Sequence, residues 1–198
     1  MIKSMLNSSK NRCIWPLGDE VYLKYHDEEW GVPVYDDQEL FEMLILEGAQ
    51  AGLSWITILK RRKNYRIAYD GFDPTVMAAW NDSKIISLYA NKDIIRNRLK
   101  IMAARGNARA YMKVLEEFTS FREFIWSFVN YKPITNFWKS WDKTPAKTKE
   151  SENMSKELKA RGFQFVGPTI CYAYMQAIGM VNDHITSCFR HSEIANLN

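Results

Sequence analysis

The sequence predicts a mainly α-helical fold, and three observations support this. Glycine and proline make up about 8% of the 198 residues, against ~12% in an average globular protein, so an all-β fold with many turns is disfavoured. Several segments begin with a helix-capping residue and end near a glycine. Hydrophobic residues account for 46% and aromatic residues for 14%, which excludes disorder of the whole chain and provides a core without disulfide bonds.

Apolar residues at helical spacing place helices along most of the chain. The first follows Asp36, which with Glu39 resembles a capping box, and it stops near Gly48. The polar stretch 142–154 is expected to be a loop. Further helices are expected over residues 54–69, 82–90, 94–118 with a break at Gly106, and 121–129.

The C-terminal third predicts two helices joined by a hairpin. Residues 155–161 are expected to be helical, residues 162–167 turn the chain, and Pro168 opens the second helix. Proline suits this position because the first helical residue needs no intrahelical N–H bond. The hairpin and the second helix would expose N–H groups that favour a phosphate. Alone this signal is weak, since glycine-containing turns join many pairs of helices.

Charge is divided unevenly along the chain. The formal net charge is +4, but residues 1–55 carry four basic and ten acidic side chains. Residues 56–198 carry 23 basic and 13 acidic side chains. A basic half is typical of proteins that bind a polyanion, although solvated helix faces explain it equally well. With three cysteines, no apolar segment at the N-terminus and no membrane-spanning stretch, we expect a cytoplasmic protein without a membrane partner.

Two pairs of residues indicate a metal site. Cys13 and His26 are spaced as C-x12-H, and His184 and Cys188 as H-x3-C, which would place the second pair on one helix face. Two thiolates and two imidazoles suit a closed, structural zinc site that ties the two ends of the chain together. The alternative is a set of core histidines and small buried thiols.

Glu47 is a second candidate functional residue. It lies three residues after Leu44 and seven after Leu40, on the apolar face of its helix and near the C-terminus, where a negative charge is disfavoured. If the helix ends earlier, Glu47 is simply solvated. Aromatic residues usually form core, but rings beside a carboxylate also suit a planar base. These rings are Trp15, Tyr22, Tyr25, Trp30 and Trp55.

Seven strings together resemble the bacterial 3-methyladenine DNA glycosylase I family, and they cover about residues 12–188. In order they are RCIW (12–15), YHDEEWG (25–31), LFEMLILEGAQAGLSW (40–55), RGNARAY (105–111), FIWSFVN (124–130), RGFQFVG (161–167) and ICYAYMQAIGMVNDH (170–184). The nucleophile elbow, the phosphate-binding glycine loop and the dinucleotide fingerprint are all absent from the sequence, which disfavours common hydrolases and kinases.

The resemblance implies a helix-hairpin-helix DNA glycosylase fold with a structural zinc ion. The enzyme would flip 3-methyladenine out of double-stranded DNA containing alkylated purines and hydrolyse its N-glycosidic bond, as a monomer and without a lyase step. The implied site has Glu47 as catalytic and base-binding residue; Tyr22, Tyr25 and Trp55 as base-binding residues; Leu53 as wedge; Gly167 and Thr169 in the hairpin; and Cys13, His26, His184 and Cys188 as zinc ligands.

Other glycosylases of this superfamily carry a catalytic aspartate after the second hairpin helix. Here Val181 and Asn182 stand at that place, and Asp183, one residue on, is a reserve candidate. We expect one helical domain over residues 12–190, which could form two lobes, with a loosely held extension at 1–11 and a tail at 191–198.

Two other functions compete with the enzyme. A lesion-binding module of the same fold would bind without releasing a base, and Glu47 together with Tyr25 and Trp55 argues against it. A zinc-stabilised scaffold for protein partners would make the basic half and the hairpin irrelevant.

Overall fold

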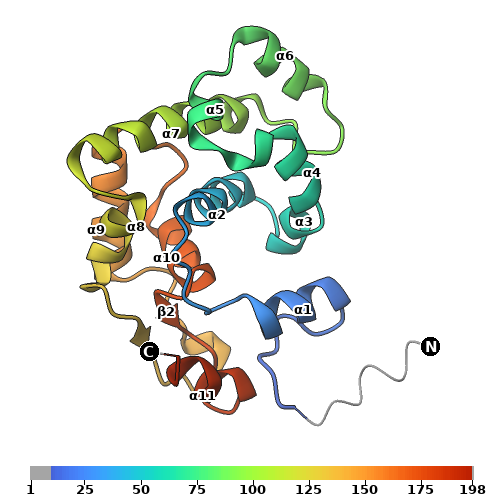
Figure 1. The fold of residues 1–198 in the computed structure, drawn as a ribbon. Helices are drawn as coiled ribbons and strands as arrows, with labels where there is room; N and C mark the ends of the chain where they lie inside the picture. The colour runs from blue at the N-terminus through green and yellow to red at the C-terminus, as the bar shows by residue number, and fades with distance from the viewer. Residues whose placement is uncertain (1–9, 198) are drawn as a thin grey trace.

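The computed structural model describes residues 10–197 and is mainly helical, as predicted (Figure 1). Most of the expected N-terminal extension, residues 1–9, lies outside the described residues. Among residues 10–197, no helix is long and apolar enough to cross a bilayer. The elements are α1 (Glu20–Glu28), α2 (Asp37–Gln50), α3 (Trp55–Leu59), α4 (Arg62–Ala68), η2 (Asp70–Phe72), α5 (Pro74–Ala78), α6 (Asp82–Ala90), α7 (Arg98–Glu117), α8 (Phe121–Trp126), η3 (Ser127–Val129), β1 (Ile134–Thr135), η4 (Trp141–Lys143), α9 (Lys149–Ala160), α10 (Pro168–Ala177), β2 (Val181–Asn182) and α11 (Phe189–Ala195).

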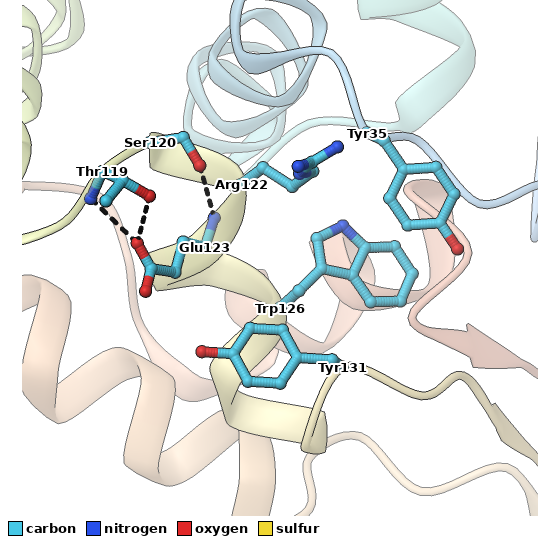
Figure 2. A pocket seen from close by; sticks show the side chains of 7 residues that line it. All are labelled: Tyr35, Thr119, Ser120, Arg122, Glu123, Trp126 and Tyr131. Atoms are coloured by element: carbon cyan, nitrogen blue, oxygen red, sulfur yellow. Dashed lines mark hydrogen bonds between the residues drawn. The ribbon is translucent and has the colours of Figure 1, made fainter.

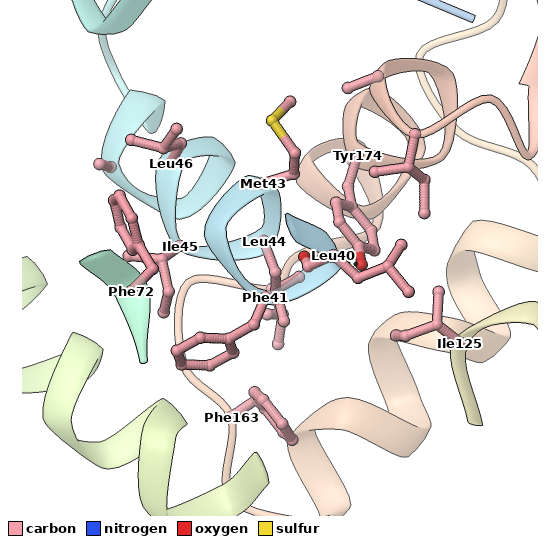
Figure 3. Packing of buried hydrophobic residues seen from close by; sticks show 14 of the residues in the cluster. Leu40, Phe41, Met43, Leu44, Ile45, Leu46, Phe72, Ile125, Phe163 and Tyr174 are labelled. Carbon is pink, nitrogen blue, oxygen red and sulfur yellow. Dashed lines mark hydrogen bonds between the residues drawn. The ribbon is translucent and has the colours of Figure 1, made fainter. Parts of the chain in front are cut away.

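Helix α2 is the centre of the fold and packs against α3, α7, α8 and α10. Its residues 40–49 are all buried, so apolar side chains project from every side of the helix. Figure 3 shows them packed against Phe72, Phe163 and Tyr174 from other segments. Asp36 caps the helix by accepting the Glu39 N–H at 2.9 Å, which is one of the two bonds of the predicted capping box. Any polar side chain within residues 40–49 is therefore carried into the interior.

Tertiary packing shifts several predicted helix boundaries. The helix expected over 54–69 is two helices, because the chain breaks at Lys60 and Arg61 and sends Arg62 inward. Helix α2 continues past Gly48, whose missing Cβ would lie 3.3 Å from the Cβ of Phe165 in the hairpin. The expected break at Gly106 is wrong: α7 runs through this residue, and an internal glycine costs a helix only about 1 kcal/mol.

The C-terminal third contains the predicted pair of helices, α9 and α10, which pack together and are joined by a turn. Pro168 is at the start of α10, as predicted. The prediction of a loop over residues 142–154 is wrong for its second half, because Thr148 and Ser151 form a capping box that starts α9. The segment expected to be a tail instead lies largely in α11, where Ile194 is fully buried.

Two short parallel strands join segments that lie far apart in the sequence. Ile134 of β1 pairs with Val181 of β2, and Thr135 pairs with Asn182. The segment that follows β1 is thereby placed beside the segment that follows β2. No periodic pattern in the sequence indicates these two-residue strands.

Candidate active site and metal-ligand cluster

The two buried carboxyl groups of α2 have opposite surroundings. Glu42 accepts hydrogen bonds from Arg62 Nε at 2.6 Å and from Arg66 Nε at 2.9 Å. Glu47 is 3% exposed, and its Oε2 atom has no hydrogen-bond partner among the described residues. Burial raises the pKa of Glu47 to about 8, so the protonated form predominates at neutral pH. The alternative of a solvated Glu47 is wrong, and its position points to a function.

Glu47 lines a cavity of about 290 Å³, near the lower end of the range for small-molecule sites. The structure brings Tyr22, Tyr25, Glu47 and Trp55 together in its wall, the set that the sequence suggested for base binding. The Tyr25 and Trp55 ring centroids are 5.6 Å apart. The remaining lining residues are Trp15, Trp30, Gln50, Trp141, Ala173 and Gln176.

Polar groups in this wall lack partners. The indole Nε1 atoms of Trp15 and Trp55 are buried without an acceptor among the described residues, and Glu47 Oε2 is buried without a donor. Burial, followed by the charge of Glu47, raises the pKa of Tyr25 well above its ordinary value, so its phenol stays protonated. Each unsatisfied group costs about 1–3 kcal/mol. A planar ligand with polar edges would satisfy them.

Sequence reasoning missed three residues of the wall. Gln50 lies in the last turn of α2, past the glycine at which that helix was expected to end. Trp141 lies in η4, within a segment that shows no helical periodicity. Gln176 lies three residues after Ala173 on α10, and this spacing places the two on one helix face.

The residues suggested for DNA contact lie outside this cavity wall. Leu53 is in the turn between α2 and α3 and is 40% exposed. Gly167 is the N-cap of α10, where no side chain accepts the first N–H groups. Thr169 follows in the first turn and lines a second cavity, which shares Trp141, Ala173 and Gln176 with the first.

The four predicted metal ligands meet in one buried cluster. The ligand atoms of Cys13, His26, His184 and Cys188 all lie within 4.8 Å of one another. His184 Nδ1 is 3.7 Å from Cys13 Sγ and 3.6 Å from Cys188 Sγ, close to the ~3.5 Å between S and N ligands of a tetrahedral zinc ion. The expected helix across His184 and Cys188 is wrong, because a turn after β2 brings them together.

Groups around the cluster orient both imidazoles. His26 Nδ1 lies 2.8 Å from Asp27 Oδ1, and His184 Nε2 lies 3.0 Å from the Trp30 carbonyl oxygen. Each imidazole donates through that nitrogen, which leaves His26 Nε2 and His184 Nδ1 free to accept a metal. Arg12 in turn holds Asp27, with Nη2 and Oδ2 2.7 Å apart. Such outer hydrogen bonds are typical of metal sites, and the residues present fit a metal ion.

A larger cavity of about 410 Å³ lies elsewhere and has different chemistry. Figure 2 shows the rings of Tyr35, Trp126 and Tyr131 around it. The buried Trp126 Nε1 already donates to the Val34 carbonyl at 2.9 Å, and the carboxylate of Glu123 is engaged by Thr119. The smaller cavity with the unpaired carboxyl is therefore the candidate active site.

Solved structures similar to this one include 3-methyladenine DNA glycosylases. A crystal structure of 3-methyladenine DNA glycosylase I is 51% identical, has a TM-score of 0.88, and the match covers 90% of this chain and 98% of that chain. The Staphylococcus aureus structure is 35% identical, with a TM-score of 0.88 over 92% and 97% of the two chains. The fold and the cavity thus define the class of helical DNA glycosylases.

The chain belongs to the methyladenine glycosylase family, whose model matches residues 15–191. DNA-3-methyladenine glycosylase 1 of Escherichia coli is 50% identical over 177 residues, which are 89% of this chain and 95% of that protein. DNA-3-methyladenine glycosylase of Haemophilus influenzae is 48% identical over 89% of this chain and 96% of that protein. The predicted family resemblance is confirmed.

Proposed function

We propose that this protein is a base-excision repair enzyme that releases 3-methyladenine from alkylated double-stranded DNA. The observation that carries the proposal is the buried, unpaired carboxyl of Glu47 in an aromatic cavity. A structural relative, 35% identical with a TM-score of 0.87, was solved in complex with 3-methyladenine. Because Glu47 is 3% exposed, a base must leave the duplex stack to reach it, which costs a few kcal/mol.

Glu47 distinguishes the damaged base by charge. Methylation at N3 leaves the base formally cationic, and a cation beside a buried carboxyl favours its ionised form. The methylated base thus makes Glu47, whose pKa is raised to about 8, release its proton to solvent and become a carboxylate that accepts hydrogen bonds from the purine edge. Neutral adenine provides no such charge. Stacking on Tyr25 and Trp55 adds about 1–3 kcal/mol per base.

Bond cleavage then needs little from the protein. The C1′–N9 bond breaks with its electron pair going to the base, which becomes neutral without being protonated. A water oxygen bonds to C1′ and releases its proton to solvent, while the Glu47 carboxylate stabilises positive charge on the sugar. No lysine is found among the described residues of the cavity wall, which supports a monofunctional enzyme that does not use an amine nucleophile for strand cleavage.

Three residues outside the cavity hold the DNA. Leu53, exposed in its turn, fills the space that the flipped nucleotide leaves. Gly167 and Thr169 present the uncapped N–H groups of α10 to a backbone phosphate. The enzyme acts in this way as a monomer.

The cluster of Cys13, His26, His184 and Cys188 holds a zinc ion in this proposal. Four nitrogen and sulfur ligands satisfy tetrahedral zinc, so the ion supplies structural cross-linking and no water for catalysis. A hydrogen bond from Cys13 lowers the pKa of the Cys188 thiol, which favours the thiolate that a metal requires. The preference for zinc over other metals follows from this donor set.

The role of Glu47 is tested by single-turnover release of 3-methyladenine from methylated duplex DNA. Glu47→Ala is expected to lower the rate by about 10²-fold or more, with zinc content unchanged. Glu39→Ala, on the exposed first turn of the same helix, is the matched control and should release base at the wild-type rate. Undiminished release by Glu47→Ala would overturn the proposal.

A further inference from the structure

Asp183 is fully buried, and its carboxylate accepts hydrogen bonds from four different side chains. Oδ1 accepts from Asn136 Nδ2 at 2.8 Å and from Trp138 Nε1 at 2.7 Å. Oδ2 accepts from Tyr172 OH at 2.6 Å and from Gln176 Nε2 at 2.7 Å. A carboxylate has about four acceptor positions, so all of them are occupied. Asp183 therefore has no lone pair left for a substrate proton or an attacking water.

The four donors come from two segments that build the base cavity. Tyr172 and Gln176 lie on α10, and Gln176 is part of the cavity wall. Asn136 and Trp138 lie in the segment after β1 that leads to Trp141, also in the wall. One buried carboxylate thus holds both segments to each other.

The bond to Asp183 also fixes the polarity of the Gln176 amide. An ionised carboxylate only accepts hydrogen bonds, so Gln176 must turn its NH₂ group toward Asp183. Its carbonyl oxygen Oε1 has no partner within residues 10–197 and is left as a fixed acceptor at the cavity. The cavity then presents acceptors from both Gln176 and Glu47 to the edge of a base.

We propose that Asp183 is a positioning residue that orients Gln176 as a hydrogen-bond acceptor for the bound base. The inference rests on the proposed function for its ligand and assigns specificity to a pair of residues, Asp183 and Gln176. It also replaces the expectation that Asp183 stands in reserve as the catalytic aspartate.

Asp183→Asn should invert this polarity. The indole of Trp138 can only donate, so the introduced asparagine must keep its carbonyl toward Trp138 and turn its NH₂ toward Gln176. The Gln176 amide then rotates, accepts from the asparagine and presents its own NH₂ to the cavity. Replacing an acceptor by a donor should raise KM for methylated DNA about tenfold, with kcat changed less than about threefold. Asp93→Asn, which removes the same charge at an exposed position, should leave KM unchanged.

A second substitution separates positioning from simple loss of structure. When Asp183→Asn is combined with Gln176→Glu, the new carboxylate accepts from the introduced asparagine through one oxygen and faces the cavity with the other. KM should therefore return to within about threefold of the wild-type value. Failure of the double variant to recover, in a protein that is folded and retains its metal, would overturn the inference. So would a wild-type KM in Asp183→Asn.

Amide exchange of Gln176 gives a readout that needs no catalysis. In wild-type protein the NH₂ of Gln176 bonds to a buried carboxylate, and its NMR signals should exchange slowly with solvent. In Asp183→Asn the same signals should exchange at least about tenfold faster, because the NH₂ faces the cavity. Equal rates would overturn the positioning role even where the wild type excises the base. If the wild type releases no base but exchange accelerates as expected, the proposed function fails and the positioning of Gln176 stands.

Discussion

Glu47 is held where its charged form is disfavoured, and this follows from its place in a helix that is buried on all sides. Glu42, five positions earlier, meets two arginines, whereas Glu47 meets none among the described residues. A carboxyl that folding leaves unpaired must lower the stability of the protein at high pH. The same property lets a cationic ligand provide the missing partner.

Glu47→Gln should therefore stabilise the protein in alkaline solution. The folded carboxyl titrates near 8 instead of its ordinary 4.5, so between these values the folded state holds a proton that the unfolded state has lost. Wild-type stability falls as pH rises through this window, by roughly 5 kcal/mol in total, and the glutamine variant lacks this loss. Urea unfolding at about pH 5 and about pH 8.5 measures the difference between the two proteins.

Glu39→Gln is the control for that experiment, because its exposed side chain keeps the same surroundings on unfolding. The difference in free energy of unfolding between Glu39→Gln and the wild type should be equal at both pH values. If Glu47→Gln behaves in the same way, the carboxyl is not desolvated as the structure indicates.

Single residues were predictable from the sequence where a local pattern fixed their direction. Glu47 could be placed on the apolar face because Leu40 and Leu44 precede it at helical spacing. The place of Trp141 in the cavity could not be predicted, because Trp141 follows an irregular segment after β1 that Asp183 holds in position. Long-range contacts of this kind leave no periodic signal.

Helix α2 ends beside the turn that carries Leu53, and Lys100 of α7 holds that end in place. Its Nζ donates to the carbonyl oxygens of Ala49 at 2.7 Å and Ala51 at 2.5 Å. A cation at a helix C-terminus satisfies carbonyls that lack intrahelical partners. The position of the proposed wedge thus depends on a residue about fifty positions away in the sequence.

Lys100→Met should loosen this turn and reduce excision from duplex DNA about tenfold. Excision from single-stranded DNA should fall much less, because a wedge acts only where a partner strand leaves a gap. Parallel rate measurements on the two substrates test this. Lys113→Met, on the exposed face of the same helix, serves as the control, and an equal loss on both substrates would rule out the role given to the turn.

Element boundaries were predictable where capping residues act locally. Asp36 and Pro168 mark the starts of α2 and α10 as the sequence predicts. The end of α2 was not predictable from Gly48, because that glycine does not form a turn. It instead allows Phe165 to pack closely against the helix. Glycine signals alone do not separate these two uses.

At the scale of the whole molecule, the Cys and His cluster joins the N-terminal segment to the segment after β2. Cys13 and His26 come from one end of the chain, and His184 and Cys188 from the other. A metal ion bound there closes a loop of more than about 150 residues, and such a cross-link stabilises mainly by restricting the unfolded chain.

Cys13→Ser should remove the metal and lower Tm by roughly 10 °C, while the rate of base release at low temperature changes less than about threefold. Metal analysis, calorimetry and the release assay measure the three quantities. Cys171 is an equally buried thiol outside the cluster, so Cys171→Ser should keep the metal. Purified wild-type protein that contains no zinc would contradict the proposal of a zinc site.

Excision from methylated DNA tests the central claim most directly. Purified protein is incubated with methylated duplex DNA, and the released bases are separated by chromatography. We predict that free 3-methyladenine is released while 7-methylguanine and adenine stay in the DNA. Adenine lacks the positive charge that ionises Glu47, and 7-methylguanine has a carbonyl oxygen where adenine has the NH₂ donor that the acceptors of the cavity require. Absence of any released base from folded, metal-loaded protein would contradict the account and favour a protein that binds the lesion without excising it.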